Sequence, residues 1–162
     1  MKTDNGSTRL CCRDTVIGRI AIAESGGVVT HLHFMDSVVE GITETGSSPL
    51  LEAAFRQLNA WLAGELKTFS LPIAPGGAGF VRRVWRALPD IPYGTTVAYT
   101  DIASAVGAPG AARAVGSACR RNPLPIIVPC HRVVCRDGRI GDYLGGAEIK
   151  RYLIDFERLN GR

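Results

Sequence analysis

The chain has 162 residues, of which 46% are hydrophobic and 21% are charged; this composition excludes a disordered chain, and the length suits one domain or two small ones. No apolar run approaches the length of a membrane span, and the polar N-terminus MKTDNGSTRL lacks the apolar core of a signal peptide, so we expect a cytoplasmic protein (nucleoid-associated, or nuclear in a eukaryote) with no membrane partner. Residues 1–75 carry six Lys/Arg against eight Asp/Glu, and residues 76–162 carry thirteen against seven, a balance that fits a nucleic-acid partner for the second half but also ordinary surface arginine.

The first half predicts a small sheet with one helix. Residues 9–34 alternate between apolar and polar positions, which indicates short strands, and Gly26-Gly27 is typical of a hairpin turn. A polar loop is expected over 36–49. Ser48-Pro49 then begins a helix of about four turns, whose apolar face comprises Leu51, Ala54, Phe55, Leu58, Trp61, Leu62 and Leu66.

A Pro- and Gly-rich segment, residues 71–79, predicts a linker, and we place the domains at 1–76 and 77–162. The second domain opens with a short apolar-faced helix that ends at Pro89. A brief β-prone segment at 96–99 follows, and Thr100 is expected to cap a helix over 101–106.

A tight turn at 107–110 leads to a second helix over 111–120, and this arrangement is typical of a helix-turn-helix. That helix, AARAVGSACR, offers small side chains and Arg113 near its start, so its backbone can approach either a nucleic-acid groove or another helix closely. Residues 126–128 are predicted to form a short buried strand. The final helix shows apolar residues at helical spacing, namely Ile149, Tyr152, Leu153, Phe156 and Leu159.

Five cysteines occur, at positions 11, 12, 119, 130 and 135. The adjacent pair at 11 and 12 is too strained for a mutual disulfide, and without an export signal we expect reduced thiols. His31 and His33 share one face of a strand, as half of a metal site or as two residues beside solvent. Because no Cys-x-x-Cys spacing is present, we predict no metal site.

The segment PIIVPCHRVVC places Cys130 directly before His131. A thiol reacts as a thiolate, so a nucleophilic cysteine needs a base. Neighbouring side chains on an extended strand point to opposite faces, so contact between these two requires a bend or a bridging water. A carboxylate can orient the imidazole, and the residues that qualify are Glu157, Asp155, Asp142 and Asp137. A structural Cys-His pair remains the alternative.

From about residue 79 to 157 the sequence resembles the O6-alkylguanine-DNA alkyltransferases. Four motifs carry the resemblance: YGTTVAYTDIA at 93–103, GAPGAARAVGSACRRNP at 107–123, VPCHRV at 128–133, and GDYLGG at 141–146 followed by Lys150. It implies an α/β (α+β) fold, with a ribonuclease-H-like N-terminal sheet and one helix, and a mostly helical C-terminal domain with a helix-turn-helix. The first 75 residues match only loosely.

The resemblance also implies the reaction, a single-turnover transfer of the methyl or alkyl group from O6-methylguanine, and also from O4-methylthymine, in DNA to Cys130. His131 acts as the base through a water, and Glu157 orients it. Asn122 ties the active-site turn to the helix-turn-helix. Tyr99 crowds the target phosphate and donates toward the base. No cofactor is implied, and the methylated protein does not turn over.

For DNA, the resemblance implies that Arg113 enters the stack in place of an extruded nucleotide, because O6 of guanine is reached by flipping the base out. The backbone of the same helix, at Ala112, Ala114 and Gly116, approaches the minor groove with little sequence preference. Tyr143, Val133, Gly145 and Gly146 wall the guanine pocket. The protein is expected to act as a monomer on double-stranded DNA.

One departure from the family pattern matters. Leu144 stands where relatives often carry a small or polar residue, which puts tolerance of large adducts in doubt. Cys135 belongs to a pattern that some relatives share, and it is expected to be buried and unreactive. Two other functions stay open on the residues alone: a helix-turn-helix module that binds damage without chemistry, and a cysteine hydrolase that uses Cys130, His131 and Glu157.

Overall fold

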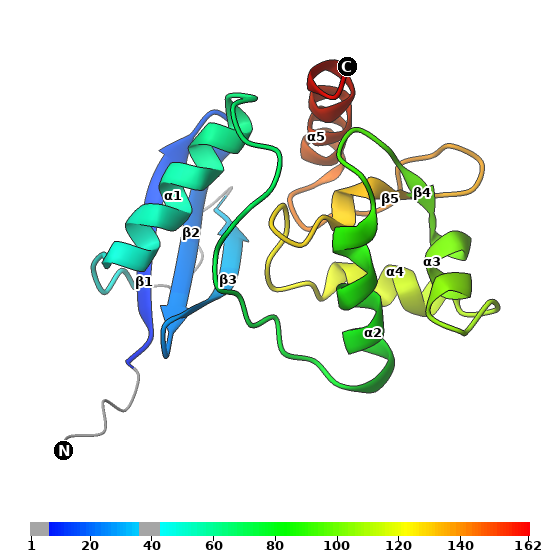
Figure 1. Cartoon of the computed structure of the whole chain (residues 1–162), viewed down its shortest axis with the longest axis horizontal. Helices are drawn as coiled ribbons and strands as arrows, with labels where there is room; N and C mark the ends of the chain where they lie inside the picture. Colours follow the sequence, from blue (N-terminus) through cyan, green and yellow to red (C-terminus); the bar gives the residue numbers. More distant parts are fainter. Residues whose placement is uncertain (1–6, 36–42) are drawn as a thin grey trace. The chain divides into compact units, whose positions relative to one another are not determined.

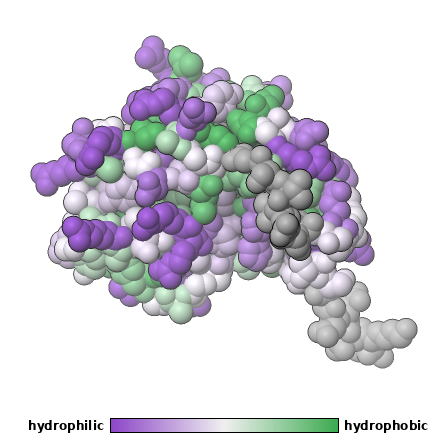
Figure 2. Space-filling model, turned by 180° about the vertical axis from the view of Figure 1, so that it is seen from behind, coloured by the Kyte–Doolittle hydropathy of each residue, from purple (hydrophilic) through white to green (hydrophobic). Residues whose placement is uncertain are grey.

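The computed structural model describes residues 7–35 and 43–162. The chain folds into two compact units, Met1–Pro75 and Gly76–Arg162 (Figure 1). Part of the loop predicted over 36–49 lies outside the described residues. Within the described ranges, no helix has both the length and the apolar character needed to cross a membrane. On the face seen in Figure 2, hydrophilic side chains are interspersed with smaller apolar areas.

The N-terminal unit contains a three-stranded antiparallel sheet in the order β1-β2-β3, as the sequence predicts. The strands are β1 (Arg9–Thr15), β2 (Gly18–Ser25) and β3 (Val28–Phe34). Gly26 and Gly27 connect β2 to β3 with φ of 60° and 81°. Two successive positive φ values are characteristic of a type I′ turn, which confirms the predicted hairpin.

One helix, α1 (Pro49–Leu62), packs on this sheet. Ser48 caps it by accepting a hydrogen bond from the Leu51 backbone N–H at 3.1 Å, which satisfies a donor that the first helical turn leaves unpaired. The helix and the sheet share a core of fully buried side chains, which includes Ile20, Ile22, Phe55, Leu58 and Trp61. The predicted helix is confirmed, although it ends four residues before Leu66.

The Pro- and Gly-rich segment predicted as a linker begins as a partner of β3. The Val29 backbone N–H donates to the Pro72 carbonyl at 2.8 Å, and the Ala74 N–H donates to the Val29 carbonyl at 3.2 Å. These bonds satisfy part of the outer edge of the sheet before the chain enters the second unit.

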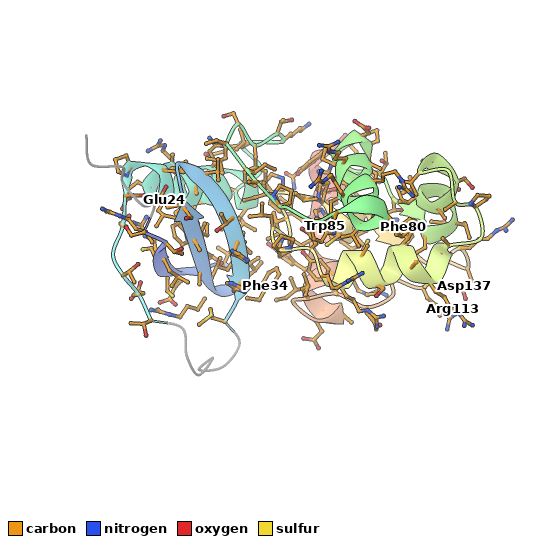
Figure 3. All side chains as sticks on the ribbon, turned by 90° about the horizontal axis from the view of Figure 1, so that it is seen from below. Glu24, Phe34, Phe80, Trp85, Arg113 and Asp137 are labelled. Atoms are coloured by element: carbon orange, nitrogen blue, oxygen red, sulfur yellow. The ribbon has the colours of Figure 1, made fainter. Side chains whose placement is uncertain are left out.

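The C-terminal unit is mostly helical, as predicted, and its only strands within the described residues form a two-stranded parallel pair. Buried Trp85 donates its Nε1–H to the Ala118 carbonyl at 2.8 Å (Figure 3). The elements are α2 (Gly79–Ala87), the short 3₁₀ helix η1 (Leu88–Asp90), β4 (Val97–Ala98), α3 (Tyr99–Ala105), α4 (Ala112–Arg120), a second 3₁₀ helix η2 (Cys130–Arg132), β5 (Val133–Val134) and α5 (Ala147–Asn160).

The predicted cap of α3 is wrong. Thr100 lies inside the helix, which begins at Tyr99 and has Ala98 at its N-cap. The Asp101 carboxylate accepts a hydrogen bond from the Ala98 backbone N–H at 2.8 Å. The capping interaction therefore comes from a side chain one turn inside the helix, as in the second half of a capping box.

The strand predicted over 126–128 is also wrong. The backbone there makes a tight turn, with Ile126 at φ 73° and the Val128 N–H donating to the Leu124 carbonyl at 2.8 Å. The Asn122 side chain accepts from the Leu124 N–H at 3.0 Å and donates to the Val128 carbonyl at 2.8 Å. Because a side chain satisfies these backbone groups, the segment needs no partner strand.

Candidate active site

The turn after residue 128 places Cys130 at the start of η2. The Cys130 N–H donates to the Val128 carbonyl at 2.8 Å, and the Arg132 N–H donates to the Pro129 carbonyl at 3.1 Å. This is the bend that a contact between Cys130 and its neighbour requires, because a strand would send the two side chains to opposite faces. Cys130 is 3% exposed and His131 is fully buried.

A carboxylate orients the His131 ring. Glu157 Oε1 lies 2.8 Å from His131 Nε2. Of the four carboxylates that the residues alone left open, the one at His131 is therefore Glu157, which the family resemblance also implied. Arg132 binds the same carboxylate through Nε at 3.1 and 3.0 Å and through one terminal nitrogen at 2.8 Å. Its other terminal nitrogen donates to the Ile91 carbonyl at 2.8 Å.

These contacts determine the protonation states of Glu157 and His131. Burial alone would raise the pKa of Glu157, but the hydrogen bonds from His131 and Arg132 lower it to about 2, so the carboxylate is ionised. His131 Nε2 therefore carries the proton and donates to Glu157, which makes Nδ1 the basic ring nitrogen. Burial lowers the pKa of His131 in spite of Glu157, so the ring is neutral at physiological pH and able to accept a proton.

The Cys130 thiol is protonated in the resting protein. Burial raises its pKa to about 11, against the opposing effects of the Asn122 side chain and the Lys150 charge. A thiol in this state reacts slowly with a bulk electrophile at neutral pH. Reaction therefore requires a base, and the next residue in the chain, His131, carries a neutral imidazole.

Lys150 brings a buried positive charge to the same site. Only 1% of the residue is exposed, and Nζ lies 2.7 Å from the Val133 carbonyl, 3.2 Å from the Tyr99 hydroxyl and 3.3 Å from the Asp142 carbonyl. An ammonium group only donates, so the Tyr99 oxygen accepts from it. The hydroxyl proton of Tyr99 is consequently directed away from Lys150.

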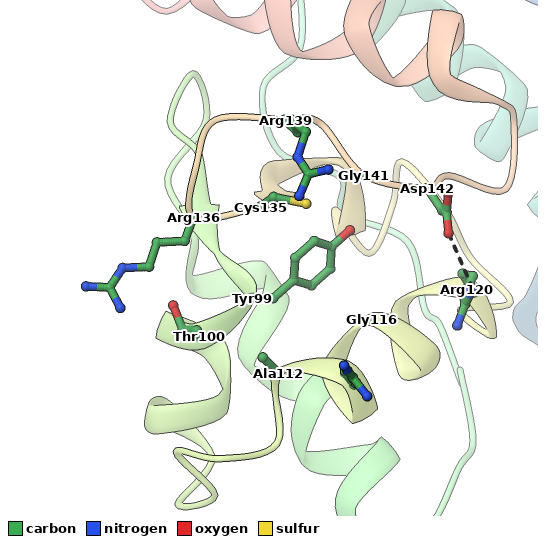
Figure 4. Close-up of a pocket in the computed structure, with 11 residues that line it drawn as sticks. Tyr99, Thr100, Ala112, Gly116, Arg120, Cys135, Arg136, Arg139, Gly141 and Asp142 are labelled. Atoms are coloured by element: carbon green, nitrogen blue, oxygen red, sulfur yellow. Dashed lines mark hydrogen bonds and ion pairs between the residues drawn. The ribbon is translucent and has the colours of Figure 1, made fainter.

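The Tyr99 ring is held between two glycines. A Cβ added at Gly116 of α4 would lie 3.7 Å from the ring, and one added at Gly141 would lie 2.8 Å from the hydroxyl oxygen. Burial raises the pKa of Tyr99, so the phenol keeps its proton. The ring lines a pocket of about 650 Å³ (Figure 4), whose other lining residues are Thr100, Ala112, Arg113, Gly116, Arg120, Cys135, Arg136, Arg139, Gly141 and Asp142.

Comparison with known proteins identifies the family of the chain. Residues 79–159 match the family described as 6-O-methylguanine DNA methyltransferase, DNA binding domain, and residues 12–75 match its ribonuclease-like domain. The chain belongs to the 6-O-methylguanine DNA methyltransferase family. Both halves of the expected fold are thereby confirmed, and the C-terminal unit is the DNA-binding domain of the family.

Full-length relatives support the same membership. The constitutive methylated-DNA–protein-cysteine methyltransferase of Bacillus subtilis is 43% identical over 155 residues, which cover 91% of this chain and 93% of the relative. The Mycobacterium tuberculosis methylated-DNA–protein-cysteine methyltransferase is 44% identical over 148 residues, covering 90% and 89%.

Solved structures of relatives show the same fold. A crystal structure of Mycobacterium tuberculosis OGT in complex with DNA has a TM-score of 0.85 at 41% identity, covering 94% of each chain. The O6-methylguanine-DNA methyltransferase of Pyrococcus kodakaraensis has a TM-score of 0.68 at 28% identity, covering 93% of this chain and 99% of that one.

In this member of the 6-O-methylguanine DNA methyltransferase family, the predicted DNA-binding residues lie on two helices: Tyr99 begins α3, and the other four residues lie on α4. Arg113 and Ala114 are exposed on α4, and Ala112 and Gly116 are half-buried beside them. Arg113, Ala112, Gly116 and Tyr99 all line the pocket, whereas Ala114 does not.

The residues predicted for the guanine pocket lie elsewhere. Tyr143, Val133, Gly145 and Gly146 do not line the pocket, and neither does Cys130. Val133 is fully buried in β5 and meets Lys150 through its carbonyl. Burial raises the pKa of the Tyr143 hydroxyl, and the negative charge of an ionised Cys130 would raise this pKa further. Leu144 is 44% exposed.

Sequence reasoning assigned no role to two residues of the site, Arg132 and Lys150. The buried face of α5 comprises Lys150, Leu153, Ile154 and Glu157, whereas two members of the apolar set expected there, Tyr152 and Leu159, are 44% and 73% exposed. A lysine and a glutamate seven residues apart, with apolar residues between them at helical spacing, were the available signal.

The cysteines and histidines of the sequence analysis also have definite places. All five cysteines are free thiols, and Cys135 is only half-buried and lines the pocket, contrary to expectation. His31 and His33 share a face of β3, as predicted, with ring centroids 5.5 Å apart. Among the described residues, no group of three or more His, Cys, Asp or Glu side chains is placed to hold a metal ion.

Proposed function

We propose that this protein repairs O6-methylguanine in DNA by transferring the methyl group to Cys130 in a single turnover. The observation that carries the proposal is the 2.8 Å bond between His131 and Glu157. The residue before His131 is the buried thiol Cys130, and both lie in a domain of the 6-O-methylguanine DNA methyltransferase family. O4-methylthymine is a second substrate of the same chemistry.

The protein binds duplex DNA through α4 as a monomer. The small side chains of Ala112, Ala114 and Gly116 let the helix backbone enter the minor groove, and they offer few groups that read bases, so sequence preference is weak. Arg113 fills the space of the extruded nucleotide and stacks there. Unstacking costs a few kcal/mol, and a poorly paired alkylated guanine costs the least, which selects for damage.

The transfer is a displacement at the methyl carbon. His131 Nδ1 takes the thiol proton through a water, and the Cys130 sulfur forms a bond to carbon while the bond from carbon to O6 breaks. The electron pair of that bond stays on the base. The Tyr99 hydroxyl, oriented by Lys150, donates a proton toward the base and recovers one from the imidazolium through solvent. The products are guanine and S-methylcysteine.

Neither a cofactor nor a second substrate takes part, because the lesion itself is the methyl donor. A thioether is a poor leaving group, so Cys130 stays methylated. Because Cys130 is 3% exposed and does not line the pocket, a guanine base reaches the thiol only after a neighbouring segment moves. In this proposal the moving segment is the loop that carries Tyr143, Gly145 and Gly146. The exposed Leu144 on this loop restricts the size of the adduct.

Mass spectrometry after mixing the protein with methylated duplex tests the proposal. The expected result is a permanent gain of one methylene mass, located on Cys130. Cys130→Ser should keep its affinity for DNA and gain no mass. Binding of the wild type without a mass change would leave only a damage-binding module, and turnover of an ester with regenerated thiol would make the protein a hydrolase.

A further inference from the structure

The pocket beside Tyr99 is bordered by arginines from two separate segments. Arg113 and Arg120 come from α4, and Arg136 and Arg139 come from the segment 135–141 that follows β5 (Figure 4). All four residues are exposed. Of these four arginines, only Arg113 has a role in the proposed reaction. The other three remain without a function.

Two of these cations are held by neighbouring carboxylates. Arg139 Nε lies 2.7 Å from Asp137 Oδ2, and Arg120 lies 3.3 Å from Asp142 Oδ2 (Figure 4). Their side chains are more than half exposed, at 81%, 56%, 58% and 79%. Exposed ion pairs contribute little free energy, so a phosphate can replace either carboxylate at small cost.

The segment 135–141 faces α4 across the pocket. In Figure 4, the Arg139 side chain lies over Cys135 and the Tyr99 ring, whereas Arg136 extends outward from the rim. Arg113 and Asp137 lie at the same end of the C-terminal unit in Figure 3. A strand that crosses the mouth of the pocket therefore meets α4 on one side and these two guanidinium groups on the other.

We propose that segment 135–141 is a second DNA-binding element, in which Arg136 and Arg139 bind backbone phosphates of the strand opposite the α4 border. The ligand is the phosphodiester backbone, since guanidinium forks match phosphate oxygens in charge and geometry. The inference rests on the proposed function, because it assumes that α4 enters the groove. It adds a contact that holds the strand while the nucleotide is extruded.

The salt dependence of DNA binding tests this element. Fluorescence anisotropy with an undamaged labelled duplex, repeated over a range of KCl concentrations, gives the slope of log affinity against log salt. Each phosphate contact adds about 0.9 to the slope. The double variant Arg136→Gln with Arg139→Gln should bind more weakly and lose about 2 from the slope. The double variant Arg136→Lys with Arg139→Lys should keep most of the wild-type slope, because it keeps the two positive charges.

The matched control is Arg158→Gln with Arg162→Gln, which removes the same charge from exposed positions outside the pocket. It should change the slope little. Equal slopes for the control and loop variants would overturn the proposal, because only net charge would then matter. Asp137→Asn should strengthen binding, since it releases Arg139 from its carboxylate; unchanged or weaker binding would count against the phosphate contact.

Methylation of wild-type Cys130, measured by mass spectrometry, and the salt slope of the loop variants test the repair function and the second DNA-binding element separately. If wild-type Cys130 is methylated and the loop variants keep the wild-type slope, the second DNA-binding element is wrong and the repair function stands. If wild-type Cys130 gains no mass while the slope falls in the loop variants, the phosphate contacts stand and the repair chemistry is wrong.

Discussion

Replacing Glu157 with glutamine tests how the site is held together. The carboxylate is 1% exposed and accepts hydrogen bonds from His131, from Arg132 and from the Gly94 backbone N–H, the last at 3.2 Å. Glutamine keeps the shape and one acceptor oxygen but removes the charge. Buried Arg132, 7% exposed, is then left without its counter-ion.

The loss of stability can be calculated in two independent ways. Removing one partner of a buried ion pair typically costs about 3–5 kcal/mol. The pKa of Glu157 falls from 4.5 to about 2 on folding, and at 1.36 kcal/mol per unit this corresponds to about 3 kcal/mol of stability at neutral pH. We therefore expect Glu157→Gln to lower the free energy of unfolding of the C-terminal unit by about 3 kcal/mol.

The pH dependence provides a sharper test. A carboxyl group whose pKa is lowered in the folded state stabilises above its unfolded pKa, and this contribution disappears as the pH falls through its folded pKa. The stability difference between the wild type and the glutamine variant should thus disappear as the pH falls from 4.5 to about 2. At neutral pH the difference should be complete, and near the lower limit the two proteins should have similar stabilities.

Urea unfolding followed by tryptophan fluorescence measures both quantities. Trp85 reports on the C-terminal unit and Trp61 on the N-terminal unit, so a shared Trp61→Phe background isolates the signal of interest. Asp155→Asn is the matched control, because it removes one exposed charge from the same helix and should cost less than about 0.5 kcal/mol. A loss for Glu157→Gln below about 1 kcal/mol, or a difference that does not change with pH, would show that the buried carboxylate does not stabilise the unit through its ion pair.

Two further substitutions test the surroundings of the thiol. Lys150→Met should slow alkylation of Cys130 by iodoacetamide at a fixed mildly alkaline pH, by about tenfold for each unit by which the thiol pKa rises, because the Lys150 charge lowers that pKa. Lys150→Arg should retain most of the rate, and equal rates for Met and wild type would contradict this role. Gly141→Ala should slow methyl transfer to Cys130 in a rapid-quench assay, because the new Cβ would lie 2.8 Å from the Tyr99 hydroxyl at a φ of 73°. Gly76→Ala, at a φ of 70° but with open space around it and outside the pocket, is the control and should leave the transfer rate unchanged.

Local sequence patterns were enough to predict the elements that form from neighbouring residues. The type I′ turn at Gly26-Gly27 and the Ser48 cap follow from chain-local chemistry, and both were predictable. The alternation in the first half predicted the small sheet, and the Pro- and Gly-rich segment 71–79 predicted a division of the chain into two parts. The motif around Cys130 and His131 pointed to the reaction class through its resemblance to a family.

Which distant groups meet depends on the tertiary fold, and apart from the family resemblance the residues alone did not single out the partner of His131. Nothing local chose Glu157 over Asp155, because the choice depends on which face of α5 is buried, and hydrophobic periodicity misplaced part of that face. Lys150 and Glu157 are buried there because their partners, the Val133 carbonyl and Arg132, come from β5 and η2. Buried charges are stable only when such partners are in place, and a sequence does not show partners that folding brings together.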